Sequence, residues 1–394
     1  MTGRVLLLSA LTVLLNGAIP ALPYSGDGDG CGSGSFFRMA VGQLEAQSTG
    51  PAISGGAGAT FQTFRFSDAD AVGIESISLL TTPFAAGARL GSNLRLEVST
   101  TFAQGSLNRP GGANTSLSGL TDSRVQIVAD LVQNRVTLTG QLSLPTGADS
   151  FTQEEVGLAG AVAADLLPFE ISSWGSGGGA GAGIAFFQPA GNVGIGGSLG
   201  YTVPGEFTPV DDGDFRYRPG AALALQGVVD YTLDRRSRLA LQVSWNRFQD
   251  DQVQGVNLYR SGDRLEARGS MAFAAGARGS GVAWAGYLHR SEGAYLDDLR
   301  SRPAQGLYFA GAGLRHSWGD LVLAPTADIR VQRRDDGVDQ GTLVGAGLRV
   351  EVPAGETVVI PRIHLRGGSV LIREGVESSV IGVEAGLAVR FGGR

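Results

Sequence analysis

The sequence contains too few cysteines and histidines for the common metal and disulfide sites. Among its 394 residues there are one cysteine, Cys31, and three histidines. A single thiol excludes an internal disulfide framework and any site with several cysteine ligands. His289, His316 and His364 lie on separate predicted strands, and their spacing matches no metal-binding motif. We therefore expect neither a metal nor a cofactor.

Lysine is absent, so all 31 basic residues are arginines, and they are spread along the chain in ones and twos. The formal net charge of −6 argues against a nucleic-acid partner, which favours a clustered basic surface. Charged residues make up 17% of the chain, below the roughly 25% of soluble domains. The mean hydropathy is nevertheless only +0.08, which is too low for a bundle of membrane helices.

Long apolar runs are also missing, apart from one at the N-terminus. Arg4 is followed by "VLLLSALTVLL" and then by small residues up to Ala21, which is typical of a secretory signal peptide over 1–21. This stretch is shorter than the about 20 apolar residues of a spanning helix. An exported chain with no other such stretch is either soluble outside the inner membrane or crosses the outer membrane as a β-barrel.

What the sequence does contain is alternation of apolar and polar residues. "RVTLTGQLSL", "NLRLEVSTTFAQ", "LVLAPTADIRVQ" and the final "SVIGVEAGLAVRF" each alternate with a period of two, as half-buried strands do. Soluble strands usually have about 5–6 residues, whereas these are long enough to cross a bilayer at a tilt, which takes about 9–11. The 62 glycines fit many turns and closely packed strands.

The connections between these strands alternate between short and long. Short turns are predicted at 133–134, 188–192, 234–237, 278–281, 319–320 and 353–356, and longer loops at 105–121, 146–177, 204–217, 249–264, 291–303, 333–340 and 373–378. Short periplasmic turns and longer extracellular loops are typical of outer-membrane barrels. We therefore predict an all-β protein: a transmembrane antiparallel barrel of about 16 strands, with 14 as the alternative, over 57–394 in the outer membrane of a Gram-negative bacterium.

Two segments do not follow the strand pattern. Residues 22–56 lack alternation, and we expect a periplasmic segment that either threads into the lumen as a plug or forms a disordered tail. Within 146–177, apolar residues recur at helical spacing and Ser150 and Gln153 fit a capping box. This short helix is expected to cover the rim of the barrel, with insertion into the pore mouth as the alternative.

The polar side of the alternation predicts which side chains face the lumen. Both signs of charge occur among the candidates, so ion pairs that brace the wall are favoured over strong ion selectivity. "RIHLR" concentrates three basic side chains on one strand, which either attracts an anionic solute or pairs with Glu351 and Glu384. The candidates are Arg95, Glu97, Asp130, Arg135, Asp230, Glu266, Arg268, Asp328, Arg330, Arg349, Glu351, Arg362, His364, Arg366, Glu384 and Arg390.

No enzymatic motif has the context that it requires. "GGSLG" at 196–200 has the spacing of a nucleophile elbow around Ser198, but strand alternation runs through it, whereas an elbow needs a strand-to-helix turn. "DGDG" at 27–30 resembles a calcium loop, but Arg38 stands where the bidentate glutamate belongs. We expect no catalytic residues, and a barrel hydrolase is the minor alternative.

The C-terminus resembles the signal that the barrel-assembly machinery recognises in outer-membrane proteins. In "EAGLAVRF", Glu384, Gly386, Val389 and Phe391 occupy the polar, glycine and two hydrophobic positions of that signal. The departure is that "GGR" follows Phe391, where many such proteins end on the aromatic residue. The resemblance implies the assembly machinery and outer-membrane lipid as partners.

A second resemblance suggests a function. "LSLPTG" at 142–147, "GSGGGAGAGIAF" at 175–186 and "GGSLGYTVPG" at 196–205 resemble outer-membrane proteins of phenol meta-cleavage pathways, distant relatives of the long-chain fatty-acid transporters. The Asn-Pro-Ala hatch motif of the latter is not found. The resemblance implies passive uptake of small hydrophobic or aromatic solutes. The alternatives are a general porin and a structural or adhesive barrel with a filled lumen.

Overall fold

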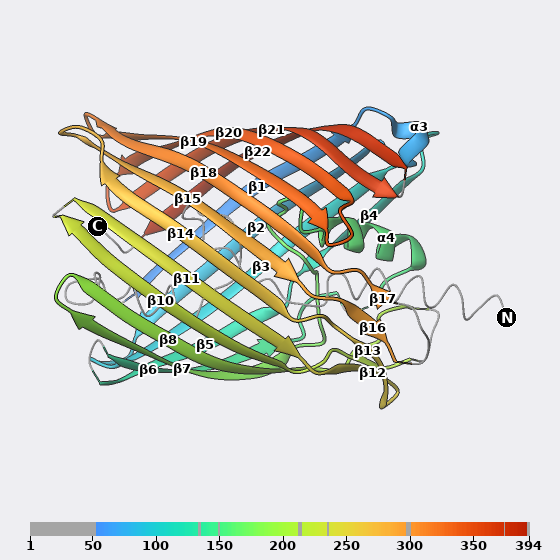
Figure 1. Ribbon diagram of the computed structural model, residues 1–394, viewed down its shortest axis with the longest axis horizontal. Coiled ribbons are helices and arrows are strands. Elements are labelled where there is room, and N and C mark those ends of the chain that lie inside the picture. Colours follow the sequence, from blue (N-terminus) through green and yellow to red (C-terminus); the bar gives the residue numbers. More distant parts are fainter. Residues whose placement is uncertain are drawn as a thin grey trace.

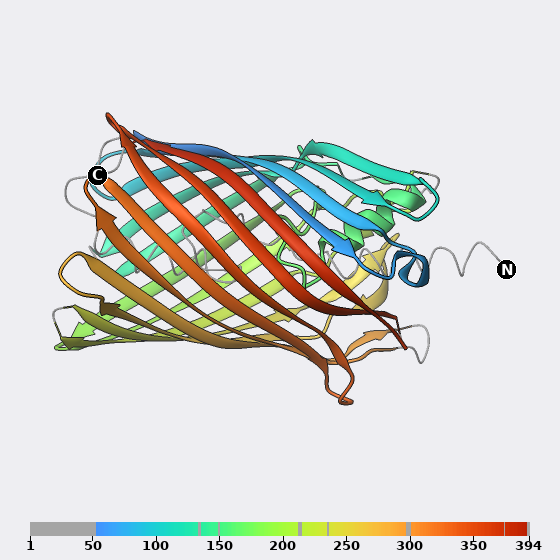
Figure 2. The ribbon, with the colours of Figure 1, turned by 90° about the horizontal axis from the view of Figure 1, so that it is seen from above.

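The computed structural model describes residues 53–132, 135–148, 150–211, 215–234, 236–296, 301–373 and 375–391. In this part of the chain the strands form one antiparallel sheet whose ends meet, because β22 pairs with β1. Figures 1 and 2 show the resulting barrel, with its strands inclined to the long axis. The predicted signal peptide and residues 22–52 lie outside the described residues, while residues 53–56 belong to the first strand.

The described sheet has sixteen strand positions, as predicted. One position is shared by two strands, β4 and β5, which follow each other along β3 and are separated by Thr121 and Asp122. The strands are β1 (Ile53–Phe66), β2 (Ser76–Arg89), β3 (Leu94–Asn108), β4 (Asn114–Leu120), β5 (Ser123–Val132), β6 (Val136–Leu144), β7 (Gly179–Ala190), β8 (Val193–Pro204), β10 (Ala222–Asp234), β11 (Ser237–Phe248), β14 (Arg264–Ala274), β15 (Gly279–Arg290), β18 (Gln305–Trp318), β19 (Leu321–Arg334), β20 (Asp339–Ala354), β21 (Thr357–Arg373) and β22 (Val376–Phe391).

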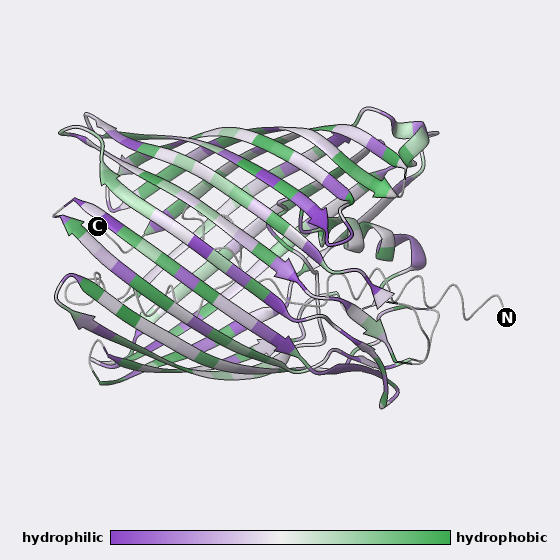
Figure 3. Cartoon of the chain, in the orientation of Figure 1, coloured by the Kyte–Doolittle hydropathy of each residue, from purple (hydrophilic) through white to green (hydrophobic). Residues whose placement is uncertain are grey.

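Apolar and polar residues alternate along the strands, as the hydropathy colours of Figure 3 show. On β22, Ile381, Leu387 and Phe391 are exposed on the outer face, and Glu384 faces the interior, where its carboxylate contacts Arg362 and Arg366. In water, an apolar outer surface of this extent is unfavourable, whereas in a bilayer it is the required surface of a closed sheet.

Most of the long predicted loops contain structure of their own. A second sheet of five short strands lies at the loop end of the barrel: β9 (Tyr217–Arg218), β12 (Asp250–Val253), β13 (Val256–Arg260), β16 (Gly293–Tyr295) and β17 (Ser301–Arg302). Phe207, Tyr217, Tyr259 and Tyr295 form its apolar core. We call this the loop sheet.

The prediction of a loop over 105–121 was wrong. β3 runs to Asn108, β4 begins at Asn114, and the two strands pair from Phe102–Leu120 to Asn108–Asn114. The polar residues of this stretch alternate with buried Leu107 and Leu117, so it is a hairpin that extends the wall. Residues 67–75, with the short helix α3 (Ala69–Val72), and residues 90–93 form two further connections that the alternation does not predict.

The predicted helix is present as α4 (Gln153–Val162), but its N-cap is two residues later than predicted. Thr152, not Ser150, is the N-cap, and its hydroxyl accepts from the N–H of Glu155 while the Glu155 carboxylate accepts from the N–H of Thr152. The residue three positions after Thr152 is a glutamate, and this completes the reciprocal pair. Ser150 instead donates to the carboxylate of Asp211.

Candidate functional site: a segment inserted in the lumen

The connection between β6 and β7 enters the barrel. We call residues 145–178, apart from Asp149, the inserted segment. The prediction that it covers the rim was wrong, because Val156, Leu158 and Val162 of α4 pack with inward-facing apolar residues of β2, β3 and β4. The coil after α4 then contacts the inner wall at Gln62 of β1, at Ala103 of β3 and at Arg290 of β15.

Asp122 holds both ends of the inserted segment at the break between β4 and β5. Its Oδ1 accepts from the N–H of Gly147 at 3.1 Å, and its Oδ2 accepts from the N–H and the hydroxyl of Ser176 at 2.9 and 2.8 Å. The N–H of Gly178 donates to the same Oδ2 at 3.3 Å. One carboxylate therefore fixes where the segment leaves the wall and where it returns.

Asp165 joins the coil after α4 to one side of the wall. Its Oδ2 lies 3.0 Å from Nη2 of Arg290 on β15, and its Oδ1 lies 3.9 Å from Nη2 of Arg264 on β14. Arg330 on β19 donates to the carbonyl oxygens of Asp165 and Leu166, each at 3.3 Å. Burial by itself raises the pKa of Asp165, but the surrounding arginines outweigh it and hold the pKa below its usual value.

Glu170 joins the same coil to strands on both sides of the seam, which is the pairing of β22 with β1 that closes the barrel. Its carboxylate accepts from Arg362 on β21 and from the hydroxyl of Thr81 on β2, and its N–H donates to Oε1 of Gln62 on β1 at 2.9 Å. Nε of Arg362 also lies 3.2 Å from Oε1 of Glu384 on β22. The coil is thus bound into an ion-pair network that crosses the closure of the sheet.

Apolar packing supports these polar anchors. Trp174 is fully buried, and its indole N–H donates to the carbonyl oxygen of Ala103 on β3 at 3.2 Å. A Cβ added to Gly105 would lie 2.8 Å from the Trp174 ring and 3.4 Å from Leu158, so the absence of a side chain at Gly105 makes room for the indole. The core that surrounds the segment is made of aliphatic and aromatic side chains from the wall on both sides of the seam.

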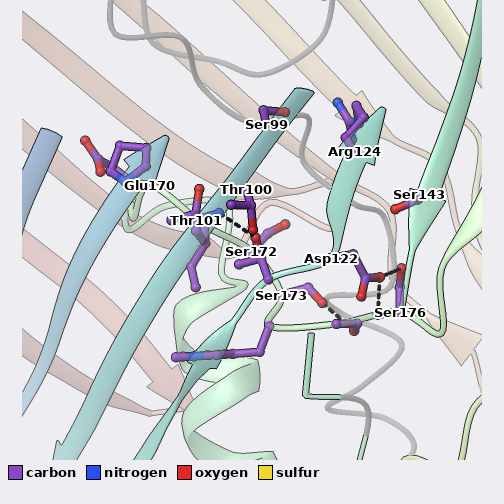
Figure 4. Close-up of a pocket in the computed structure, with 15 residues that line it drawn as sticks. Ser99, Thr100, Thr101, Asp122, Arg124, Ser143, Glu170, Ser172, Ser173 and Ser176 are labelled. Atoms are coloured by element: carbon purple, nitrogen blue, oxygen red, sulfur yellow. Dashed lines mark hydrogen bonds between the residues drawn. The ribbon is translucent and has the colours of Figure 1, made fainter. Parts of the chain in front are cut away.

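A recess lies between the inserted segment and the inner faces of β2, β3 and β5 (Figure 4). Hydroxyl groups dominate its lining, contributed among others by Ser99, Thr101, Ser143 and Ser172. Asp122, Arg124 and Glu170 are its charged members. The recess is therefore a polar compartment beside the segment.

Most inward positions of the wall formed by β7 and β8 carry small residues. Ile184 and Phe186 of β7 and Leu199 of β8 are exposed on the outer face, so the residues between them face inward. Those residues are Gly181, Gly183, Ala185, Phe187, Gly194, Gly196, Ser198, Gly200 and Thr202. Phe187 is the one bulky residue among them, and its ring lies against Gly194 near the turn between the two strands. The short side chains of this wall fill little of the lumen.

The structure brings several of the predicted lumen residues together. Glu384 binds both Arg362 and Arg366, with Arg366 Nη1 at 3.0 Å from Oε2. His364 Nε2 lies 2.7 Å from Oδ1 of Asp328. Of the two acids considered as partners of "RIHLR", Glu384 therefore fits for both arginines, and the histidine pairs elsewhere. Glu351 pairs instead with Arg349 at 3.2 Å and with Arg315 at 3.0 Å.

Apart from Arg330, the other predicted residues have no contact with the inserted segment among the interactions described here. Arg95 pairs with Glu97 on its own strand at 2.9 Å, and Asp230 accepts from Arg238 on β11 at 2.5 Å. Asp130 accepts from the hydroxyl of Thr137 at 2.8 Å. Glu266 and Arg268 face inward on β14, Arg330 binds the segment as described, and Arg390 lies at the exposed end of β22. Arg135 is in the turn before β6 and not in the lumen.

Sequence reasoning missed the residues that hold the inserted segment. Three of them, Asp122, Asp165 and Glu170, lie outside regular strands. In such segments no alternation in the sequence predicts which way a side chain points. Arg290 and Arg264 stand at strand ends. Arg124 could have been found, because it shares the inward register of Asp130 on β5.

The residues of the predicted assembly signal occupy the seam. Val389 and Phe391 are on the outer face, 37% and 40% exposed, and Phe391 pairs with Gly55 of β1. Gly386 faces inward opposite Thr60, and a Cβ there would lie 2.9 Å from Nε of Arg362. The glycine of the signal thus makes room for the ion-pair network behind it.

A closed antiparallel sheet with an apolar outside, a charged inside and a segment folded into it defines an outer-membrane β-barrel of the porin-like kind. This confirms the predicted fold class and the outer-membrane location. No helix in the described ranges is both long and apolar enough to cross a membrane. Within the same ranges, no group of three or more acidic, histidine or cysteine side chains is placed to hold a metal ion.

Comparison with known proteins finds similarity only at the level of solved structures. No protein-family model matches the chain, and no curated protein matches it. A bacterial polysaccharide outer membrane secretin is 12% identical with a TM-score of 0.44, covering 86% of this chain and 98% of that chain. OmpT of Vibrio cholerae without its loop L8 is 10% identical with a TM-score of 0.44 and the same coverages. An anion-selective porin from Comamonas acidovorans is 14% identical with a TM-score of 0.41, again at 86% and 98%.

Proposed function

We propose that the protein is a passive outer-membrane channel for small organic solutes, and that the inserted segment sets the width of its path. The observation that carries this proposal is the double anchoring of the segment, through Asp165 to β15 and through Glu170 to β21. A segment held to the wall at two separate strands is a fixed constriction and not a flexible cover.

The remaining path runs between the segment and the wall of β7 and β8. A barrel whose lumen is filled by side chains needs bulky residues on every wall. Apart from Phe187, the inward residues of this wall are glycines, an alanine, a serine and a threonine, which do not meet that need. Their small size supports a channel over a structural or adhesive barrel with a filled lumen.

Permeation of liposomes tests this function. Proteoliposomes should swell in isosmotic solutions of small solutes, with rates that fall as solute size rises, and matched liposomes without protein should not. Liposomes that stay tight with correctly folded protein would favour the structural alternative. Folding is checked on unheated gels, because closed barrels migrate faster than the boiled chain.

Two classes of solute are compatible with such a channel: hydrophobic or aromatic solutes, and hydrophilic solutes. The resemblance to proteins of phenol meta-cleavage pathways supports hydrophobic or aromatic solutes. The charged network of Arg362, Arg366 and Glu384 at mid-height supports a general porin for hydrophilic solutes, because charges favour a hydrated path. Faster uptake of a phenol than of a sugar of equal size would support the first, and uptake ordered by size alone would support the second.

The partners follow from the outer surface and the seam. Outer-membrane lipid would contact the exposed apolar side chains, and the barrel-assembly machinery would bind the last strand through Val389 and Phe391. Since residues 53–56 belong to β1, the plug prediction is restricted to residues 22–52. This plug and a non-enzymatic role remain predictions.

A further inference from the structure

We propose that Arg124, with the hydroxyls that flank it, is a binding subsite for the carboxylate of a small organic monoanion. The subsite lies in the recess beside the inserted segment (Figure 4). The proposal deepens the channel function proposed above by naming a class of solute and the residue that holds it.

Arg124 faces inward and has no acidic partner in the described part of the chain. It is 9% exposed, and its Nε is buried without a hydrogen-bond partner there. Arg95, Arg290 and Arg362 each lie within ion-pair distance of a carboxylate. A buried guanidinium without an acceptor is unfavourable, so an acceptor from solution is expected to occupy the site.

The strands on both sides of Arg124 supply additional donors. Ser99 of β3 and Ser143 of β6 stand directly opposite Arg124 in the two ladders, and all three line the recess. A guanidinium binds a carboxylate through two parallel hydrogen bonds. Hydroxyls at either side can donate to the remaining lone pairs of the carboxylate oxygens.

Two carboxylates in the lining limit the charge of the ligand. Asp122 and Glu170 both border the recess, and each is held by donors of its own, so neither is used by Arg124. A doubly charged anion is repelled by these two groups more strongly than a singly charged one. Pro83 and Ile171 add apolar surface to the lining, which suits the organic part of a monocarboxylate.

Benzoate binding to the purified, folded protein in detergent tests the subsite without requiring conduction. Titration calorimetry is compared for the wild type, Arg124→Gln and Arg124→Lys. We expect Arg124→Gln to raise the Kd about tenfold or more, since it removes a charge-assisted bidentate contact. Arg124→Lys keeps the positive charge but loses the two parallel N–H donors of the guanidinium, so it should give an intermediate Kd. Unheated gels confirm that each variant is folded.

The matched control is Arg238→Gln, which removes the same charge from an arginine that is paired with Asp230. Its benzoate Kd should stay within about twofold of the wild type. Equal Kd values for wild type and Arg124→Gln, or no binding by the wild type, would overturn the proposal. Sulfate that binds more tightly than benzoate would overturn the assignment to a monocarboxylate. Liposome swelling, measured separately, decides the channel function whichever result benzoate gives.

Discussion

The carboxylate of Asp165 lies 3.0 Å from the guanidinium of Arg290, and this ion pair joins the coil after α4 to the wall at β15. The two side chains are only 16% and 11% exposed, and Arg290 relies on Asp165 for charge compensation. Together with the contacts of Glu170, the pair makes the inserted segment part of the barrel interior.

Removal of this anchor should loosen the segment. Asp165→Asn leaves Arg290 buried without its acidic partner, which costs about 3 kcal/mol or more. We expect larger and noisier single-channel currents than in the wild type. Asp230→Asn, which breaks an ion pair between β10 and β11 away from the segment, is the control and should keep quiet currents. Equal currents in the Asp165→Asn variant and the wild type would contradict the anchoring role.

Acid should weaken the same anchor in the wild type. The arginines hold the pKa of Asp165 below its usual value, so the stabilisation is fully present above an unfolded-state pKa of about 3.9. It is lost only as the pH falls through the lower folded-state pKa. Current noise recorded from pH 7 downward should therefore rise only below about pH 4, and this rise should be absent in Asp165→Asn. Noise that increases between pH 7 and 5 would point to another group.

Asp122 should control access of proteases to the inserted segment. Asp122→Ala removes the acceptor of four hydrogen bonds that fix Gly147, Ser176 and Gly178. Cleavage within 146–178 by a protease added to folded protein should become at least about tenfold faster, since the unpaired donors destabilise the closed form by more than 1.4 kcal/mol. Asp130→Ala, which loses one hydrogen bond from Thr137, should leave the cleavage pattern unchanged.

The loop sheet should become less stable as the pH rises through 6. Burial raises the pKa of Asp251 to about 6, although the N–H of Gly220 and the hydroxyl of Tyr217 bind its carboxylate. A raised folded-state pKa means that this contribution to stability is largest below about pH 4 and is lost by pH 7, a change of about 3 kcal/mol. Hydrogen exchange in 250–260 should therefore show greater protection at pH 5 than at pH 7, after correction for intrinsic rates.

Two variants test whether ionisation of Asp251 causes this pH dependence. Asp251→Asn should abolish it, since the residue no longer ionises. Tyr217→Phe removes a hydrogen bond that lowers the pKa of Asp251, so the transition should move to higher pH. A transition that is unchanged in Asp251→Asn would assign it to a different group.

The seam should depend on Phe391 and on the glycine beneath it. A Cβ added to Gly55 would lie 2.7 Å from the Phe391 ring, so Gly55→Val should hinder closure of β22 on β1. Phe391→Ala leaves the ladder possible but removes the aromatic residue of the assembly signal. If the signal matters, Phe391→Ala should lower the folded fraction in cells severalfold and still refold in detergent, whereas Gly55→Val should fail in both. Normal amounts of folded Phe391→Ala in cells would contradict the signal.

The sequence predicted the wall of the barrel well, for a local reason. Each strand must place apolar side chains toward lipid and polar ones inward, so a period of two identifies both the strand and the direction of residues such as Glu384 and Arg366. Boundaries failed where polar alternation continued beyond the expected bilayer, as at β3 and β4. The cap of α4 was misplaced because Ser150 and Thr152 both begin plausible helices.

By itself, the sequence determined a closed sheet of long strands and the side chains that each strand turns inward, because these depend on neighbours along the chain and on the solvent at each face. Only the tertiary structure decided that the inserted segment enters the lumen, and that Asp165 and Glu170 contact arginines on strands far away in the sequence. Such contacts leave no periodic pattern in the sequence, because they depend on which parts of the wall face each other after the barrel has closed. The same holds for Arg124, whose register was readable but whose lack of a partner in the described part of the chain appears only when the surrounding strands are in place.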